Sequence, residues 1–128
     1  MEEISDIATV NDIQKMVNTF YDKIKEDELL GPIFNERIQD HWTMHLETMY
    51  KFWGNLLFGN NTYHGRPFPP HATLPINQEH FEQWVKVFVL NIDIHFKGPK
   101  TEEAKTRAQS IAAIFQHKIE SMRADTNS

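Results

Sequence analysis

Apolar residues recur at intervals of three and four along four stretches of the chain, which is the spacing of one face of an α-helix. The stretches begin near the potential helix caps Asn11, Asp40, Asn77 and Thr101. Their apolar positions are Ile13, Met16, Val17, Phe20, Tyr21 and Ile24; Trp42, Leu46, Met49, Tyr50, Trp53, Leu56 and Leu57; Phe81, Trp84, Val85, Phe88, Ile92 and Phe96; and Ala104, Ala108, Ile111, Ala112, Phe115, Ile119 and Met122. No stretch keeps the alternation of a β-strand for long. The pattern predicts an all-α fold of four amphipathic helices.

The remaining segments read as connections within one domain over residues 1–128. We expect a loose N-terminal arm over residues 1–10 and a polar tail over residues 123–128. Residues 27–32 end with Gly-Pro and are predicted to close the first helix, so that residues 33–34 fold back as an apolar pair in a short connection.

The longest connection, residues 59–76, contains Pro67, Pro69, Pro70 and Pro75, so no long helix can run through it. Two of these prolines fit the first turn of a helix and the last one would stop it, which predicts about one helical turn carrying His71. A loop of this length inside a compact domain is usually functional or disordered. The segment either places an imidazole for a purpose or carries a surface histidine on a stiff connection.

Composition excludes several classes of protein. The net charge is -5 and the basic residues are scattered, so we expect no nucleic-acid partner and no membrane partner held by charge. The absence of cysteine excludes disulfides, thiolate metal sites and thiol catalysis. The acidic N-terminus lacks the pattern of a signal peptide and no apolar run reaches the length of a membrane span, so we expect a cytoplasmic protein.

Nine Phe and three Trp are many for 128 residues, and such rings either fill a core or line a pocket for a flat apolar ligand. Three polar groups lie on apolar helix faces, at Tyr21, His45 and Trp84, although each has an alternative interpretation as a core residue. One rigidly presented imidazole, apolar walls and a few polar groups are the features that haem requires. His41 and His45 also have a spacing that can hold zinc, but position 42 is Trp where metalloproteases carry glutamate.

Taken together, these residues resemble the truncated haemoglobins, and specifically their third group, from about residue 10 to residue 120. The resemblance is carried by Phe20-Tyr21, Leu30-Gly31-Pro32-Ile33-Phe34, His45, Phe52-Trp53, His71 and Trp84. Other truncated groups carry glycine pairs at helix junctions, and this chain has no Gly-Gly.

The resemblance implies a two-over-two helical sandwich around haem b, with His71 as the proximal iron ligand. It also implies that Tyr21 and Trp84 are distal hydrogen-bond donors, and that His45 occupies a position where globins place a ligand-contacting or gating side chain. Met49 stands where a more compact aliphatic residue is expected. The further haem-contacting residues that the resemblance implies are Phe34, Phe52, Trp53, Leu74, Phe81, Phe88, Ile111 and Phe115, with Arg66 reaching a propionate.

These roles imply a haem protein that binds dioxygen, nitric oxide or related diatomic ligands. Two or three distal donors would hold oxygen too tightly for easy delivery and favour redox chemistry, either nitric oxide dioxygenation or peroxidase-like turnover. Sustained turnover would require a separate reductase, since the chain contains no reductase domain. The alternatives are a gas-binding or sensing module without turnover and, much less favoured, a helical zinc protein using His41 and His45. We expect a monomer.

Overall fold

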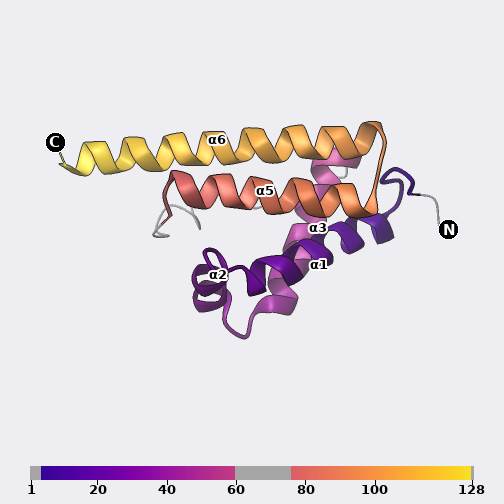
Figure 1. Cartoon of the computed structure of the whole chain (residues 1–128), viewed down its shortest axis with the longest axis horizontal. Coiled ribbons are helices and arrows are strands. Elements are labelled where there is room, and N and C mark those ends of the chain that lie inside the picture. Colours follow the sequence, from indigo (N-terminus) through magenta and orange to yellow (C-terminus); the bar gives the residue numbers. More distant parts are fainter. Residues whose placement is uncertain (1–3, 60–75, 128) are drawn as a thin grey trace.

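The computed structural model describes residues 4–59 and 76–127, with side chains described as far as residue 122. The described residues form helices α1 (Val10–Glu26), α2 (Gly31–Ile38), α3 (Trp42–Phe58), α5 (Gln78–His95) and α6 (Pro99–Asn127), and they include no strand (Figure 1). The prediction of an all-α fold is confirmed. Within the described ranges, no helix is both long and apolar enough to cross a membrane.

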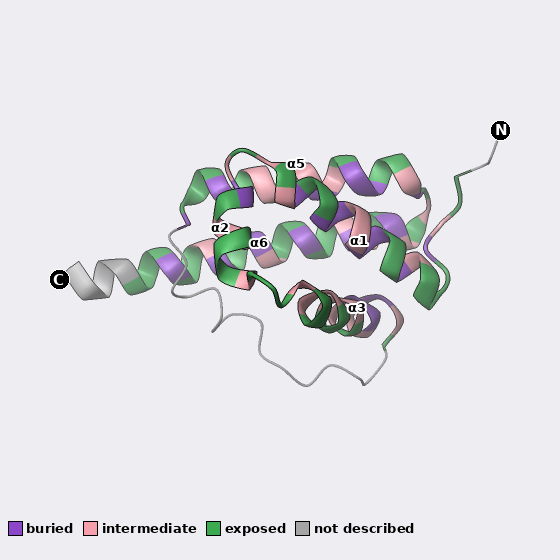
Figure 2. Cartoon of the chain, turned by 90° about the horizontal axis from the view of Figure 1, so that it is seen from below, coloured by how far each residue is buried: buried purple, intermediate pink, exposed green. Residues whose placement is uncertain are grey.

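The helices are arranged as two packed pairs. Helices α5 and α6 lie side by side along the long axis of the molecule, and α1 packs against α3 beneath them (Figure 1). The pairs are joined because α1 also contacts α5 and α3 also contacts α6. Buried residues line the inward faces of the helices (Figure 2).

The core has two parts that meet at Trp84. The larger cluster joins α1, α3, α5 and α6, and it includes the six apolar positions predicted for α1, which are all buried. The smaller cluster lies between the first turns of α5 and the middle of α6, where Phe81 packs near Phe115 and Ile119. Trp84 is half-buried and packs against both clusters, so the two parts of the core are continuous.

Three of the four predicted helix caps, Asn11, Asp40 and Thr101, differ from the structure. Helix α1 begins at Val10 and is capped by Thr9, whose hydroxyl accepts a hydrogen bond from the Asp12 N–H, while the Asp12 carboxylate accepts one from the Thr9 N–H. This reciprocal capping box satisfies two N–H groups and places the start of the helix before the predicted cap Asn11. The N-cap of α3 is His41 rather than Asp40, and no side-chain hydrogen bond caps this helix.

The predicted irregular connection after α1 is wrong, because residues 31–38 form helix α2. Pro32 lies in the first turn of this helix, where a proline needs no N–H partner. Asp27 precedes the helix, and its carboxylate accepts hydrogen bonds from the N–H groups of Leu29 and Leu30 at 3.0 and 2.8 Å. Gly-Pro therefore begins a second helix as well as following the first.

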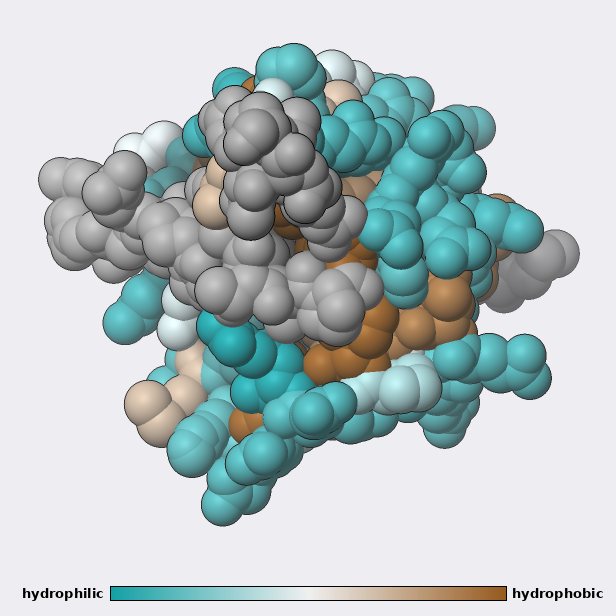
Figure 3. Space-filling model, turned by 90° about the vertical axis from the view of Figure 1, so that its left-hand side faces the viewer, coloured by the Kyte–Doolittle hydropathy of each residue, from teal (hydrophilic) through white to brown (hydrophobic). Residues whose placement is uncertain are grey.

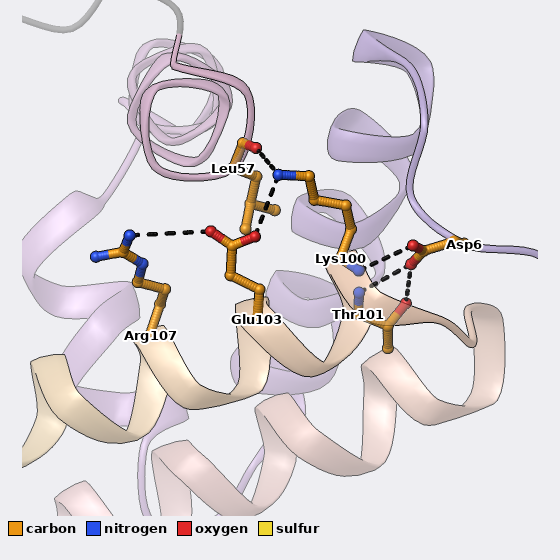
Figure 4. Close-up of polar contacts among 6 residues, drawn as sticks. All are labelled: Asp6, Leu57, Lys100, Thr101, Glu103 and Arg107. Carbon is orange, nitrogen blue, oxygen red and sulfur yellow. Dashed lines mark hydrogen bonds and ion pairs between the residues drawn. The ribbon is translucent and has the colours of Figure 1, made fainter.

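Helix α6 starts at Pro99, before the predicted cap at Thr101, and continues through Asn127. The acceptor for its first N–H groups comes from the N-terminal arm. The Asp6 carboxylate accepts hydrogen bonds from the N–H groups of Lys100 and Thr101 and from the Thr101 hydroxyl, each at 2.8 Å (Figure 4). Gly98 makes room for this contact, since a Cβ at that position would lie 2.5 Å from Asp6 Cγ.

The N-terminal arm is therefore packed from residue 5 onward rather than loose. Ile7 is 2% exposed, and the Lys97 N–H donates to the Ser5 carbonyl at 3.1 Å. At the same corner, Lys100 Nζ donates to the Leu57 carbonyl in the last turn of α3 (Figure 4). A cation at this end of a helix is favoured by the helix dipole. The arm, α3 and α6 thus meet at one junction.

Asp6→Asn should lower the free energy of unfolding by about 1–3 kcal/mol at neutral pH, because a charged acceptor of three hydrogen bonds is lost. Burial alone would raise the pKa of Asp6, but its hydrogen bonds outweigh burial and lower the pKa. A lowered carboxyl pKa gives stability that is present above the unfolded-state pKa of about 4 and is lost as the pH falls through the folded-state pKa. Urea unfolding of both proteins from pH 7 to pH 3 should therefore show a difference that shrinks in acid.

Asp22→Asn is the matched control, since Asp22 is an exposed aspartate on α1. It should leave stability nearly unchanged across the same pH range. An Asp6→Asn protein as stable as the control at pH 7 would show that the arm does not stabilise α6.

Candidate functional site

A cavity of about 800 Å³, including its open mouth, lies between the helices. Hydrophobic surface gathers on the face at the left-hand end of Figure 1, beside hydrophilic side chains (Figure 3). The described lining residues are Phe20, Tyr21, Leu30, Phe34, Met49, Phe52, Trp53, Ile76, His80, Phe81, Trp84, Ile111, Ala112 and Phe115.

The wall is mainly apolar, and few of its described side chains can donate a hydrogen bond. They belong to Tyr21 on α1 and to His80 and Trp84 on α5. An apolar pocket with a small number of placed polar groups is typical of a site that holds a largely apolar ligand and orients its polar atoms.

The Tyr21 side chain is 6% exposed and is surrounded by rings. Its ring lies edge-on to those of Phe20 and His45, with centroid distances of 5.0 and 4.9 Å. Burial raises the pKa of Tyr21 well above its usual value of 10. The hydroxyl therefore keeps its proton at neutral pH and can act as a hydrogen-bond donor.

Trp84 reaches the wall from a different helix but shares a neighbour with Tyr21. The Trp84 ring stacks on Phe88 at 5.8 Å and lies edge-on to Phe20 at 5.6 Å. Because Phe20 contacts both rings, the phenol and the indole pack against the same support. The fold thus brings together two donors that are 63 positions apart in the sequence.

His45 lies behind this wall rather than on it. Its ring is edge-on to Tyr21, with an interplanar angle of 85°, and also edge-on to Trp42 at 5.9 Å. The Nε2 atom is buried. Lys25 Nζ lies 4.4 Å from the centre of the Trp42 ring, so the cluster extends from Tyr21 towards the charged ends of surface side chains.

Most of the predicted haem-contacting residues that the structure describes lie on the cavity wall. These are Phe34, Met49, Phe52, Trp53, Phe81, Ile111 and Phe115. Phe88 is 1% exposed and stacks on Trp53 at 5.1 Å and on Trp84, so it supports the wall from behind. His71, Arg66 and Leu74 lie outside the described residues.

Sequence reasoning did not select five of the lining residues, of which His80 is the polar one. The other four are Phe20, Leu30, Ile76 and Ala112. His80 could have been found from its spacing, because it stands three residues after the cap Asn77 and four before Trp84. Positions four apart share a helix face. Phe20 and Ala112 stand on core-facing stripes and Leu30 and Ile76 in predicted connections, so their positions did not mark them as lining residues.

The turn between α1 and α2 fixes Phe34 relative to α5. Asp27, whose second carboxylate oxygen caps this turn, accepts a hydrogen bond from Gln83 Nε2 at 2.7 Å. Burial would raise the pKa of Asp27, but the hydrogen bonds outweigh it and lower the pKa, so the carboxylate is charged at neutral pH. Gly31 approaches α1 closely, since a Cβ there would lie 2.6 Å from the Lys25 carbonyl oxygen.

The described residues contain no group of three or more histidine, aspartate or glutamate side chains placed to hold a metal ion. His41 and His45, which have zinc-compatible spacing in the sequence, lie at the N-cap and in the first turn of α3.

The comparisons with known proteins agree with this architecture. Residues 5–120 match the family described as bacterial-like globin. The chain is 36% identical over 111 residues to the group 3 truncated hemoglobin ctb of Campylobacter jejuni, a match that covers 84% of this chain and 87% of that protein. The crystal structure of a group III truncated hemoglobin from Campylobacter jejuni superimposes with a TM-score of 0.84 at 33% identity, covering 91% of this chain and 95% of that one.

An all-helical fold of two packed pairs around a ring-lined cavity is that of a two-over-two globin. The chain belongs to the bacterial-like globins, within which it is a truncated haemoglobin of the third group. Membership in this family implies that the protein binds haem and that a small diatomic gas binds at the haem. The residues of the cavity fit haem. The aromatic and aliphatic walls suit a flat apolar macrocycle, and the few hydrogen-bond donors on the wall suit polar ligands bound to it.

Gly31→Ala should disturb both the fold and the cavity. The new methyl group would overlap the Lys25 carbonyl, so α2 must shift and carry Phe34 with it. We expect a loss of about 1–3 kcal/mol in the free energy of unfolding, which is typical of overpacking, and several-fold faster loss of haem to an acceptor protein.

Gly98→Ala is a matched control with the same added methyl group far from the cavity wall. It would overlap Asp6 and strain a positive φ of 146°, so it should lower stability without speeding haem loss. Equal haem-loss rates in the two variants would contradict a role for the Gly31 contact in shaping the cavity.

Proposed function

We propose that this protein holds haem b in the described cavity, binds dioxygen and related diatomic ligands there, and performs redox chemistry on them. The reaction would be nitric oxide dioxygenation or peroxidase-like turnover, with electrons from a separate reductase. Haem iron supplies the ligand-binding centre and the one-electron chemistry. The proposal assigns the iron to His71, as the family resemblance implies.

The observation that carries the proposal is the pair of donors Tyr21 and Trp84 on a mainly apolar wall. A hydrogen bond to a ligand atom that carries negative charge contributes about 1.5–3 kcal/mol, which slows ligand release roughly 10- to 100-fold. Beside a mainly apolar wall, such bonds are stronger than in bulk water. Two donors that act together therefore favour polarisation of a held ligand over its easy release.

The surrounding residues would serve these donors. Phe20 and Phe88 hold the rings of Tyr21 and Trp84 in place, which reduces the reorganisation needed when a ligand arrives. The His45 ring contacts the Tyr21 ring, so a change in the position or charge of the imidazole would affect the Tyr21 side chain. We propose that it acts as a gate or as a support of the phenol, and that Met49 and Trp53 crowd the ligand site.

The test is a cycle of four proteins: wild type, Tyr21→Phe, Trp84→Phe and the double variant. Each single replacement removes a donor with little change in size, so oxygen dissociation should become about 10- to 100-fold faster. The double variant should be non-additive, because both donors act on one ligand. Both single variants should also consume nitric oxide more slowly when supplied with a reductant.

Carbon monoxide is the control ligand, since it takes on less negative charge when bound. Its dissociation rate should change much less than that of oxygen in all three variants. Equal effects on the two gases would mean that the substitutions act sterically, and the assignment of Tyr21 and Trp84 as donors would be wrong.

His71→Ala should abolish or severely weaken haem retention, and added imidazole should partly restore it. The measurement is the Soret absorption of the purified ferric and ferrous proteins, with His117→Ala as a control at an exposed histidine on α6. A variant that keeps full haem and an unchanged ferrous spectrum would rule out His71 as the iron ligand.

A further inference from the structure

His80 is the polar residue of the cavity wall to which neither the sequence nor the proposed reaction assigns a role. It lies in the first turn of α5, is 9% exposed, and faces the cavity beside Ile76 and Phe81. Its Nδ1 atom accepts a hydrogen bond from the Asn77 N–H at 2.9 Å, as one half of a capping box.

This hydrogen bond determines which ring nitrogen carries the proton. A backbone N–H can only donate, so Nδ1 of His80 must be unprotonated. The ring is then neutral and carries its hydrogen on Nε2. Since Nδ1 is turned to the start of its own helix, the Nε2–H is the group that remains for a ligand in the cavity.

The position of His80 differs from that of the other two donors. Tyr21 belongs to the larger core cluster, whereas Ile76 and Phe81, which line the cavity together with His80, belong to the smaller one. His80 also lies one turn closer than Trp84 to the N-terminus of α5. The N-terminal end of a helix carries a partial positive charge that favours anions.

We propose that the His80 Nε2–H donates a hydrogen bond to a carboxylate of the cofactor, which for haem b is a propionate group. The inference rests on the proposed function, because it requires haem in the cavity. A carboxylate against an apolar wall is costly unless it is hydrogen-bonded, and a neutral N–H at a helix N-terminus provides such a partner. His80 is in this sense an anchor for the edge of the cofactor, separate from the donors Tyr21 and Trp84 that act on the gas.

The experiment compares the affinity for haem with the affinity for haem dimethyl ester, in which both carboxylates are masked. Each dissociation constant is obtained from transfer of the cofactor to an acceptor protein. Wild type should prefer haem, and in His80→Phe this preference, the ratio of the two constants, should fall about tenfold. A change in the ratio isolates the contact between the carboxylate and residue 80 from any general loss of affinity.

His80→Glu is the second variant, and it keeps the start of α5 intact. Glutamate at this position of a capping box accepts the Asn77 N–H as the imidazole does, so the helix should still form. Its negative charge would repel a propionate, and the preference for haem should fall further than in His80→Phe. This variant keeps the test valid if His80→Phe folds poorly.

Two controls separate the contact from other causes. Asn77→Ala removes the other half of the capping box and keeps the imidazole, so it should lower stability but retain the wild-type ratio. Trp84→Phe removes a neighbouring donor and should also retain that ratio.

An unchanged ratio in both His80 variants, with a normal Soret band, would overturn this inference and leave the proposed function standing. Absence of a Soret band from wild-type protein supplied with haem would overturn the proposed function and the inference with it.

Discussion

The cavity between the helices of this 128-residue protein persists only if the side chains around it are held in place by their neighbours. Phe88 performs this task for two rings, because Trp53 and Trp84 both stack on it with interplanar angles of 19°. Phe20 and His45 hold Tyr21 edge-on from two sides. Aromatic side chains have few rotatable bonds, so a wall backed in this way resists collapse better than an aliphatic wall would.

The same rings determine how the polar groups behave. A hydroxyl or imidazole that is enclosed by aromatic rings has no water and few other groups to form hydrogen bonds with. The orientation of its donor hydrogen is therefore set before a ligand binds. Burial raises the pKa of Tyr21, and the hydrogen bond from the Asn77 N–H to Nδ1 leaves Nε2 of His80 as the donor.

Local periodicity was sufficient to predict most of the architecture, but not the features that depend on distant partners. The six apolar positions of α1 are all buried as predicted, because the apolar face of a helix is defined by the spacing of residues that are close in the sequence. Helix α2 was missed because Gly31-Pro32 is equally compatible with the end of one helix and the start of another.

The candidate site shows the same division between local and distant signals. Rings such as Phe34 and Phe115 could be named from the family resemblance, and the structure brings them to one cavity. His80 was missed because histidine is not the usual residue at the third position of a capping box, where glutamate or glutamine is expected. The role of Asp6 could not be predicted from local sequence patterns, because its partners are 94 and 95 positions away.

The long sequence separation between Asp6 and its partners affects the order in which the parts of the protein fold. The contacts of Asp6 with Lys100 and Thr101 close most of the chain into a loop, and they require the first turn of α6 to be formed. We therefore expect docking of the N-terminal arm to be a late step of folding and its release to be an early step of unfolding. Release would expose the first N–H groups of α6 beside Lys100, which also contacts the last turn of α3. Amide hydrogen exchange should thus start at this junction, while the rings around the cavity are still packed.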